Sequence, residues 1–221
     1  MSLPTLIIEP LPDDWLKQLP TLATVNIAIF ASTNAVHYFF KGLEAHQIPW
    51  PESITVLAIG ETTANTIKQY HQGHLYHPRI ADSEHLLQLE SVQQISGQTV
   101  LLITGRDSRP LIATTLHNKG ASVYPIPVYQ RLAPEKNLDF TQSLWQDDSI
   151  DVVLLLSQEA TANLLTLFAE KAKAWMVSKP CIVISPRLAK AAHAAGFQTV
   201  ITTTYANLLT KLASMAHDQG C

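Results

Sequence analysis

The sequence is poor in cysteine, and this scarcity bears on where the protein works. Only two of its 221 residues are cysteine: Cys181 lies in an apolar run, and Cys221 is the last residue. Small secreted domains that depend on disulfides carry many more cysteines at regular spacings. We therefore expect no disulfide framework, and a reducing cytosol suits the chain.

A basic surplus and long apolar runs are also missing. The formal net charge is -3, whereas proteins that bind nucleic acid usually carry a surplus of Lys and Arg. The N-terminus lacks the cationic region and apolar core of a secretory signal. No apolar run approaches the roughly 20 residues of a membrane span. These absences predict a soluble cytoplasmic protein that binds neither nucleic acid nor membrane, in which an anionic ligand needs local donors.

What is present favours a large core built from alternating strands and helices. The chain is 47% hydrophobic and 15% charged, with eight glycines, which argues against disorder. Short apolar runs alternate with helix-like segments, a pattern typical of α/β architecture with parallel sheets. The segment 99–131 contains the pattern in full: a strand, a polar loop, a helix that begins near Pro110 and stops near Gly120, and a second extended run.

Two arginines stand in the polar loop of that segment. Arg106 and Arg109 follow a buried strand, and open α/β sheets place ligands at the carboxyl ends of their strands. Guanidinium groups bind carboxylates or phosphates in bidentate fashion. The pattern alone leaves two interpretations open: an anion clamp, or two solvated loop residues.

An internal repeat indicates two similar domains. The segment NIAIFASTNAVHYFF aligns with DVVLLLSQEATANLL at an offset of 125 residues, which places Ser32 on Ser157. The same offset places Ile59-Gly60-Glu61 on Ile184-Ser185-Pro186. In each copy, a loop with a hydroxyl residue follows the first strand.

The second copy is shorter than the first, because it ends with the chain. Its missing strand and helix would have to precede residue 1, so the chain would cross twice between the domains. Two proline-framed extended segments are the natural crossings, and they could pair as a two-stranded ladder. We expect a complete domain at 11–124, an incomplete one at 131–221 together with 1–3, and linkers at 4–10 and 125–130.

Six motifs carry a resemblance to a known family, and together they span almost the whole chain. They are FASTNAV, AIGETTA, LLITGRDSRPLI, KGASVYPIPVYQR, LLLSQEATANLL and VISPRLAKAAHAAGF. In order and spacing they resemble the uroporphyrinogen-III synthases. The resemblance implies two flavodoxin-like parallel-sheet domains joined by a two-stranded ladder, the second lacking its N-terminal strand and helix.

The sequence departs from the family pattern in two places. Members usually begin with a strand, an Arg-Pro loop and a helix, which are missing here. We expect a start codon assigned too late or a truncated gene product, with an exposed sheet edge as the consequence. The second departure is Ser185-Pro186-Arg187, where members often carry glycine and hydroxyl residues.

The reaction implied by the resemblance is the closure of a linear tetrapyrrole. Hydroxymethylbilane loses its terminal hydroxyl to give an azafulvene cation, which attacks the substituted carbon of ring D. The spiro intermediate then fragments and recloses with ring D inverted, giving uroporphyrinogen III with net loss of water. The uncatalysed closure gives the uninverted isomer, so the protein must mainly fold the substrate and place ring D.

The resemblance also assigns roles to residues. Tyr129 is expected to donate a proton to the leaving hydroxyl, the alternative being a tyrosine that packs the ladder. The hydroxyls of Thr62, Thr63, Ser32 and Ser157 could bind substrate carboxylates or cap helices, and both can hold at once. The expected substrate ligands are Ser32, Thr33, Gly60, Thr62, Thr63, Gly105, Arg106, Arg109, Ser157 and Arg187.

We expect no cofactor, no metal and a monomer. His71, His74 and His77 are spaced like metal ligands, but alternate residues of a strand point to opposite faces. Gly60-Glu61 lacks the later glycines of a dinucleotide fingerprint. Two other function classes stay open at this point: a non-catalytic two-lobed sensor of an acidic metabolite, and a nucleotide-dependent transferase, for which no phosphate-loop motif is present.

Overall fold

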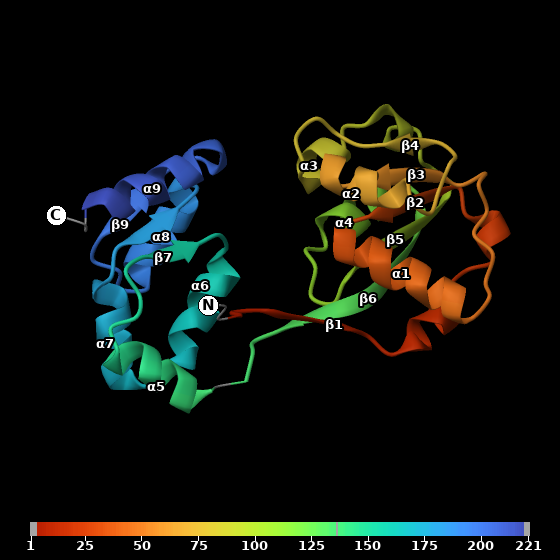
Figure 1. The fold of residues 1–221 in the computed structure, drawn as a ribbon. Coiled ribbons are helices and arrows are strands. Elements are labelled where there is room, and N and C mark those ends of the chain that lie inside the picture. The colour runs from red at the N-terminus through yellow and green to blue at the C-terminus, as the bar shows by residue number, and fades with distance from the viewer. Residues whose placement is uncertain (1–3, 136, 219–221) are drawn as a thin grey trace. The chain divides into compact units, whose positions relative to one another are not determined.

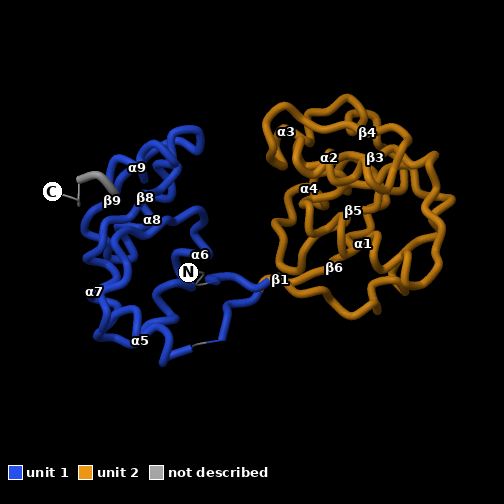
Figure 2. Tube along the Cα trace, in the orientation of Figure 1, with its two compact units in different colours: residues 1–7, 132–221 blue, residues 8–131 orange. Residues whose placement is uncertain are grey.

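The computed structural model describes residues 4–135 and 137–218, and its fold is α/β (Figure 1). The chain divides into two compact units: unit 2 is residues 8–131, and unit 1 is residues 1–7 with 132–221 (Figure 2). Residues 1–3, which the sequence analysis assigns to the second domain, and Cys221 lie outside the described residues.

Unit 2 is built around a six-stranded sheet. Its strands are β1 (Ile7–Pro10), β2 (Ile27–Phe30), β3 (Thr55–Ala58), β4 (Leu75–Tyr76), β5 (Thr99–Gly105) and β6 (Ser122–Leu132). Its α-helices are α1 (Thr33–Ala45), α2 (Glu61–Ile67), α3 (Ser83–Leu86) and α4 (Leu111–Asn118), and short 3-10 turns lie at Asp13–Gln18, Leu22–Thr24 and Glu90–Val92. All four residues of β2 are buried, as expected for the middle of a sheet covered on both faces.

The strand order is β1-β6-β5-β2-β3-β4, and the strands from β2 to β6 pair in parallel. Counted from β2, the five parallel strands lie in the order 3-2-1-4-5, with the last two strands on one side, which differs from the 2-1-3-4-5 expected of a flavodoxin-like chain. The flavodoxin order appears only when counting starts at β5. The chain therefore enters this sheet at its middle strand, which hydrophobic patterns alone do not reveal.

Strand β1 lies at the edge of this sheet beside β6, and the two run in opposite directions (Figure 1). The backbone amide of Leu11, just after β1, donates to the carbonyl of Val128 on β6 at 3.0 Å. Both segments are rich in proline, which is tolerated at a sheet edge.

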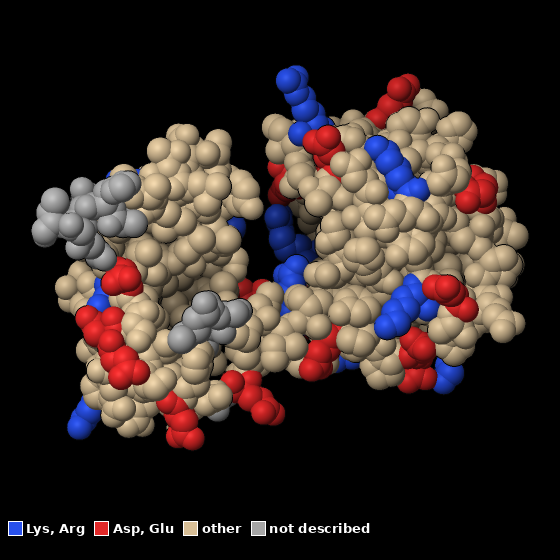
Figure 3. Space-filling view, in the orientation of Figure 1, with Lys and Arg blue, Asp and Glu red and all other residues tan. Residues whose placement is uncertain are grey.

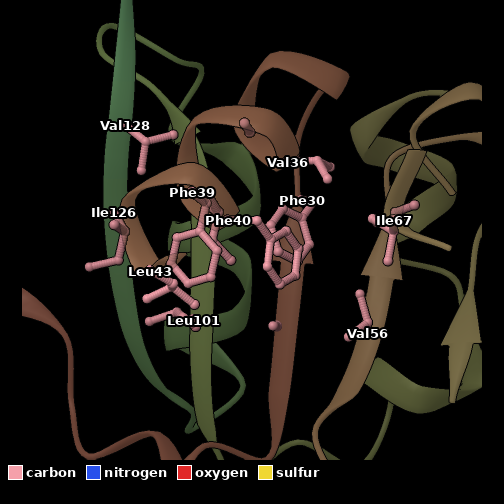
Figure 4. Close-up of a cluster of buried hydrophobic side chains, with 14 of the residues drawn as sticks. Phe30, Val36, Phe39, Phe40, Leu43, Val56, Ile67, Leu101, Ile126 and Val128 are labelled. Carbon is pink, nitrogen blue, oxygen red and sulfur yellow. The ribbon is translucent and has the colours of Figure 1, made fainter. Parts of the chain in front are cut away.

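Each face of the sheet buries its own hydrophobic cluster, because side chains alternate along a strand. Phe30 of β2 packs against α1, its ring 5.6 Å from the rings of both Phe39 and Phe40, and side chains from β5 and β6 join this cluster (Figure 4). Ile27 and Ile29 of β2 point to the other face, where helices α3 and α4 cover them. Helices on both faces hold the strand ends in place.

Unit 1 contains a smaller sheet of three parallel strands in the order β7-β8-β9. Its strands are β7 (Val153–Leu155), β8 (Cys181–Val183) and β9 (Val200–Thr202). Its helices are α5 (Leu138–Gln146), α6 (Gln158–Leu167), α7 (Glu170–Ser178), α8 (Pro186–Ala194) and α9 (Leu208–Asp218), with a 3-10 turn at Tyr205–Asn207. Among the described residues, β7 has no neighbour on the side where β5 lies beside β2. In the part of the chain that the structure describes, no helix combines the length and the apolar character needed to cross a membrane.

Candidate functional site

In unit 2 the order in which strands are added to the sheet reverses between β2 and β5, which are parallel neighbours. The connection after β2 leads toward β3 on one side, and the connection after β5 leads toward β6 on the other. Open α/β sheets bind ligands at such a switch point, just beyond the carboxyl ends of the strands. The predicted residues Ser32, Gly105 and Arg106 all lie at this point.

Ser32 follows β2 and begins the long helix α1. Its backbone is extended, and its Oγ accepts a hydrogen bond from the backbone amide of Ala35 at 3.1 Å, so Ser32 is the N-cap of the helix. The same Oγ lies 3.1 Å from the hydroxyl of Tyr129. Thr33 is the first residue of the helix and is half-buried. Capping, one of the two roles expected of Ser32, is confirmed.

Tyr129 comes from β6 and reaches across the end of β5. The pairing of these strands shifts register between Thr104 and Gly105, and the shift places Tyr129 beside Gly105. A Cβ on Gly105 would lie 2.7 Å from Cζ of the Tyr129 ring, so only glycine leaves room for it. The ring also stacks on Tyr38, with centroids 6.1 Å apart, and the side chain is only 2% exposed.

The loop after β5 is held in a defined shape. The Arg106 amide donates to the carbonyl of Tyr129 at 2.7 Å, and its Nη1 donates to Oε1 of Gln130 at 2.7 Å. Asp107 adopts a left-handed conformation with φ of 59°, and Ser108 Oγ donates to the carbonyl of Gly105 at 2.8 Å. Pro110 occupies the N-cap position of α4, one residue before the helix begins, and makes no side-chain cap. The loop therefore presents its arginines from a rigid turn.

Arg109 is held by an acidic residue, Glu84, that no sequence motif contains. Its Nη2 donates to Oε1 of Glu84 at 2.8 Å, and both side chains are exposed. The bonded guanidinium holds the pKa of the Glu84 carboxyl below its usual range. Twenty-five positions separate the two residues, and no periodic pattern joins them, so the sequence offered no signal for the pair. The sequence likewise gave no signal that Gln130 binds Arg106.

A groove of about 290 Å³ opens beside this loop. It is lined by the end of β5, the loop from Gly105 to Arg109, the first turn of α4, and two prolines of β6, Pro125 and Pro127. The prolines offer no N–H to the groove, so the polar groups that reach it come mainly from the loop. This is the cavity that contains both predicted arginines.

The predicted threonines lie after β3, in the first turn of α2. Gly60 is the N-cap of this helix and makes no side-chain bond, so the expectation that Thr62 or Thr63 caps the helix is wrong. Thr62 is exposed, whereas Thr63 is only 4% exposed. Of the two hydroxyls, that of Thr62 is the more accessible to a ligand.

In unit 1 the equivalent loops also start helices. Ser157 is the N-cap of α6 and accepts from the Ala160 amide at 3.0 Å, just as Ser32 does for α1. Ser185 caps α8, accepting from the Leu188 amide at 3.3 Å, and Arg187 follows it as an exposed side chain. The repeat seen in the sequence thus extends to capping geometry for Ser32 and Ser157, but not for Ser185, whose counterpart Gly60 makes no side-chain cap.

The three histidines spaced like metal ligands, His71, His74 and His77, differ in burial. His71 is buried, and its Nδ1 accepts from Nε1 of Trp50 at 3.2 Å and lies 3.1 Å from Glu52. His74 and His77 are exposed. Within the described ranges, no three His, Cys, Asp or Glu side chains gather as metal ligands would.

Charged side chains are scattered over the face that Figure 3 shows, with uncharged surface between them. An acidic ligand would therefore depend on individual donors such as those at the switch point rather than on a broad basic field.

Comparisons with known proteins agree with this geometry. The family model described as uroporphyrinogen-III synthase HemD matches residues 1–207. The uroporphyrinogen-III synthase of Escherichia coli (strain K12) is 30% identical over 185 residues, covering 83% of this chain and 75% of that protein. The Proteus mirabilis enzyme of the same name is 38% identical over 117 residues, covering 52% of this chain and 59% of that protein.

Solved structures share the fold. A mutant uroporphyrinogen III synthase from the extremely thermophilic bacterium Thermus thermophilus superposes with a TM-score of 0.65 at 16% identity, covering 97% of this chain and 88% of that one. The uroporphyrinogen-III synthetase from Helicobacter pylori 26695 gives the same TM-score and identity, covering 96% and 91%. The family model covers most of the chain, and the Escherichia coli relative is 30% identical over 83% of it. This chain belongs to the uroporphyrinogen-III synthase family.

Proposed function

We propose that the chain converts hydroxymethylbilane to uroporphyrinogen III by binding its carboxylates at the carboxyl ends of β2, β3 and β5. The observation that carries this proposal is the convergence of Ser32, Tyr129 and the Arg106 loop at the switch point of unit 2. Ligands of α/β sheets bind at such points. A non-catalytic sensor and a nucleotide-dependent transferase are not favoured.

The main demand of the reaction is positional. The substrate is flexible and carries several carboxylates, and its spontaneous closure gives the uninverted isomer. Holding ring D against the cation converts a rare encounter into a favoured one, an entropic contribution that enzymes use widely. Arg106 and Arg109 beside the groove and the exposed hydroxyl of Thr62 are the groups we assign to the carboxylates.

Ser157 and Arg187 in unit 1, and Thr33, Gly60, Thr63 and Gly105 in unit 2, complete the proposed set of ligands. Gly105 and Gly60 have no side-chain donor, so any contact they make to substrate uses the backbone. Thr63 is buried within unit 2, so we assign it the weakest contribution to substrate binding.

Tyr129 is the proposed source of the proton that converts the leaving hydroxyl to water. Loss of that water generates the azafulvene cation, and general acids of this kind typically contribute about 10²- to 10⁴-fold in rate. The reaction is redox-neutral, and its net change is the loss of one water. We propose that the enzyme works as a monomer in the cytoplasm. Cys181 is a free, buried thiol, which is compatible with a reducing compartment.

The test is to supply hydroxymethylbilane generated in situ, without added cofactor, and to identify the porphyrinogen isomer by chromatography. The control is the same mixture without the chain, which closes spontaneously to isomer I. Isomer III in excess of isomer I supports the proposal, and isomer I alone refutes it. Analytical ultracentrifugation of the purified chain measures its mass in solution and tests whether it is a monomer.

A further inference from the structure

Tyr129, the proposed proton source, is more deeply buried than its neighbour Ser32. The Tyr129 side chain is 2% exposed, enclosed by Tyr38 and the end of β5, whereas Ser32 is half-buried at the start of α1. A bulky tetrapyrrole meets Ser32 before it meets the phenol. We infer that Ser32 delivers the proton to the leaving hydroxyl and that Tyr129 supplies it from behind, as a two-oxygen relay. This inference rests on the proposed function.

The hydrogen bonds around Ser32 Oγ set the direction of the relay. A serine hydroxyl has one proton to donate and two lone pairs to accept with. One lone pair takes the Ala35 amide at 3.1 Å, and the Tyr129 hydroxyl lies 3.1 Å away. When Tyr129 donates to the second lone pair, the proton of Ser32 is the one left for a ligand. With both lone pairs occupied in this way, Ser32 has only its proton left to offer a ligand.

The phenol is held in place for this role. Gly105 leaves room for the ring only because it has no Cβ, and the Arg106 amide bonds the Tyr129 carbonyl at 2.7 Å. Stacking on Tyr38 fixes the other side of the ring. A phenol held on these sides keeps its hydroxyl directed at Ser32.

The proton transfer conserves atoms and charge. Ser32 gives its proton to the terminal hydroxyl of hydroxymethylbilane, and the C–O bond breaks with both electrons leaving on water. Ser32 takes the Tyr129 proton at the same time, so Tyr129 becomes a phenolate and the substrate an azafulvene cation. When ring D recloses, its unsubstituted carbon loses a proton, and this proton returns through Ser32 to Tyr129. The protein ends unchanged, and one water is released.

The competing interpretation is that Ser32 only caps α1, and substitutions at one position separate the two. Ser32→Thr keeps the cap and the hydroxyl. Ser32→Asn keeps a capping oxygen and an N–H donor, but an amide does not pass a proton along. Ser32→Ala removes both. Circular dichroism melting of each variant reports whether the helix cap survives.

The kinetic test uses steady-state rates of isomer III formation from hydroxymethylbilane. We expect Ser32→Thr to stay within a few-fold of the unaltered chain. Ser32→Asn, Ser32→Ala and Tyr129→Phe should each lower kcat by about 10²-fold or more with KM nearly unchanged. The double variant Ser32→Ala with Tyr129→Phe should be no slower than either single one, since both break the same chain. The solvent isotope effect should reveal two protons in flight in the unaltered chain and fewer in Ser32→Asn.

Each alternative outcome has a distinct meaning. Full activity in Ser32→Asn, or single effects that multiply in the double variant, overturns the relay while leaving the proposed function standing. Failure of the unaltered chain to form isomer III overturns both.

Discussion

The hydroxyl of Tyr129 lies 3.1 Å from Oγ of Ser32, and the contact spans three neighbouring strands of the sheet. Tyr129 belongs to β6, Ser32 follows β2, and β5 runs between them. The tyrosine crosses β5 at Gly105, where the register of β5 and β6 shifts. A single glycine thus permits the hydrogen bond that connects the two halves of the switch point.

Gly105→Ala should therefore impair the enzyme without removing any reacting group, because it displaces Tyr129. The added Cβ would lie 2.7 Å from Cζ and 3.0 Å from the hydroxyl of Tyr129, which forces the ring to move. We expect kcat to fall by about 10²-fold, as for loss of a general acid, and the free energy of unfolding to fall by about 1–3 kcal/mol from overpacking. Steady-state kinetics and chemical denaturation measure the two effects.

Gly97→Ala is the matched control. Gly97 has φ of +77°, so alanine there is strained, yet its Cβ would meet no atom within 4 Å. We expect a loss of about 1–2 kcal/mol from the left-handed conformation with an unchanged rate. A fully active Gly105→Ala enzyme would show that the position of Tyr129 does not matter for catalysis.

Ser157→Ala should weaken unit 1 through its helix cap. The Oγ of Ser157 accepts from the Ala160 amide at 3.0 Å, and removing such a cap costs about 0.5–2 kcal/mol. Ser157→Asp keeps the capping oxygen and should retain stability in thermal melts. If Ser157 also binds a substrate carboxylate, the added negative charge should raise KM, so KM in Ser157→Asp distinguishes a cap from a ligand.

The buried strands and the serine caps of α1 and α6 were predictable from the sequence because they depend on local patterns, whereas the expected cap of α2 by Thr62 or Thr63 was wrong. Buried strands such as Ile27–Phe30 are continuous apolar runs, and Ser32 and Ser157 stand where a cap is needed. Helix α7 is not predictable in the same way, since its sequence EKAKAWMVS has too little separation of apolar and charged residues to reveal a buried face.

The arrangement of these elements in space was harder to predict from the sequence. Which strand edges pair is decided by long-range packing, so the order β6-β5-β2-β3-β4 was not foreseen. Tyr129 lies on an extended segment, as predicted. Its burial and its bond to Ser32 depend on that long-range packing and were not expected. The ion pair of Arg109 with Glu84 likewise joins two loops that no motif connects.

Cys181 gives a prediction about pH. Burial raises the pKa of its thiol to about 11 from 9.0, because the thiolate is poorly solvated in the core. The folded state therefore keeps its proton where the unfolded state loses it. This contribution to stability is fully present below pH 9 and is lost between pH 9 and 11, by up to about 1.4 kcal/mol per pH unit.

Denaturation of the Cys221→Ser variant at pH 8, 9.5 and 10.5 measures this effect, with Cys181→Ala in the same background as the control that removes it. At pH 8, the Cys181 thiol in the Cys221→Ser variant should react with a disulfide reagent about 100-fold more slowly than a free cysteine, from its smaller thiolate fraction alone. Equally rapid labelling in the folded state would contradict burial of this thiol.

Arg109 offers the clearest test of how the substrate is held. If its guanidinium binds a substrate carboxylate in the ground state and in the transition state alike, Arg109→Gln should raise KM about tenfold and leave kcat unchanged. The exposed pair with Glu84 contributes little to stability, about 0–1 kcal/mol. Thermal melts should therefore barely move.

Glu84→Gln supplies the matched comparison, because it removes the carboxylate that competes with the substrate for Arg109. Its KM should be lower than that of the unaltered chain, the opposite direction to Arg109→Gln, although both variants break the same 2.8 Å contact. Opposite shifts of KM from the two partners of one ion pair are explained only by a direct interaction of Arg109 with an anionic ligand. If neither variant alters KM, Arg109 is a solvated loop residue, and carboxylate binding falls to Arg106 and the hydroxyl residues of the neighbouring loops.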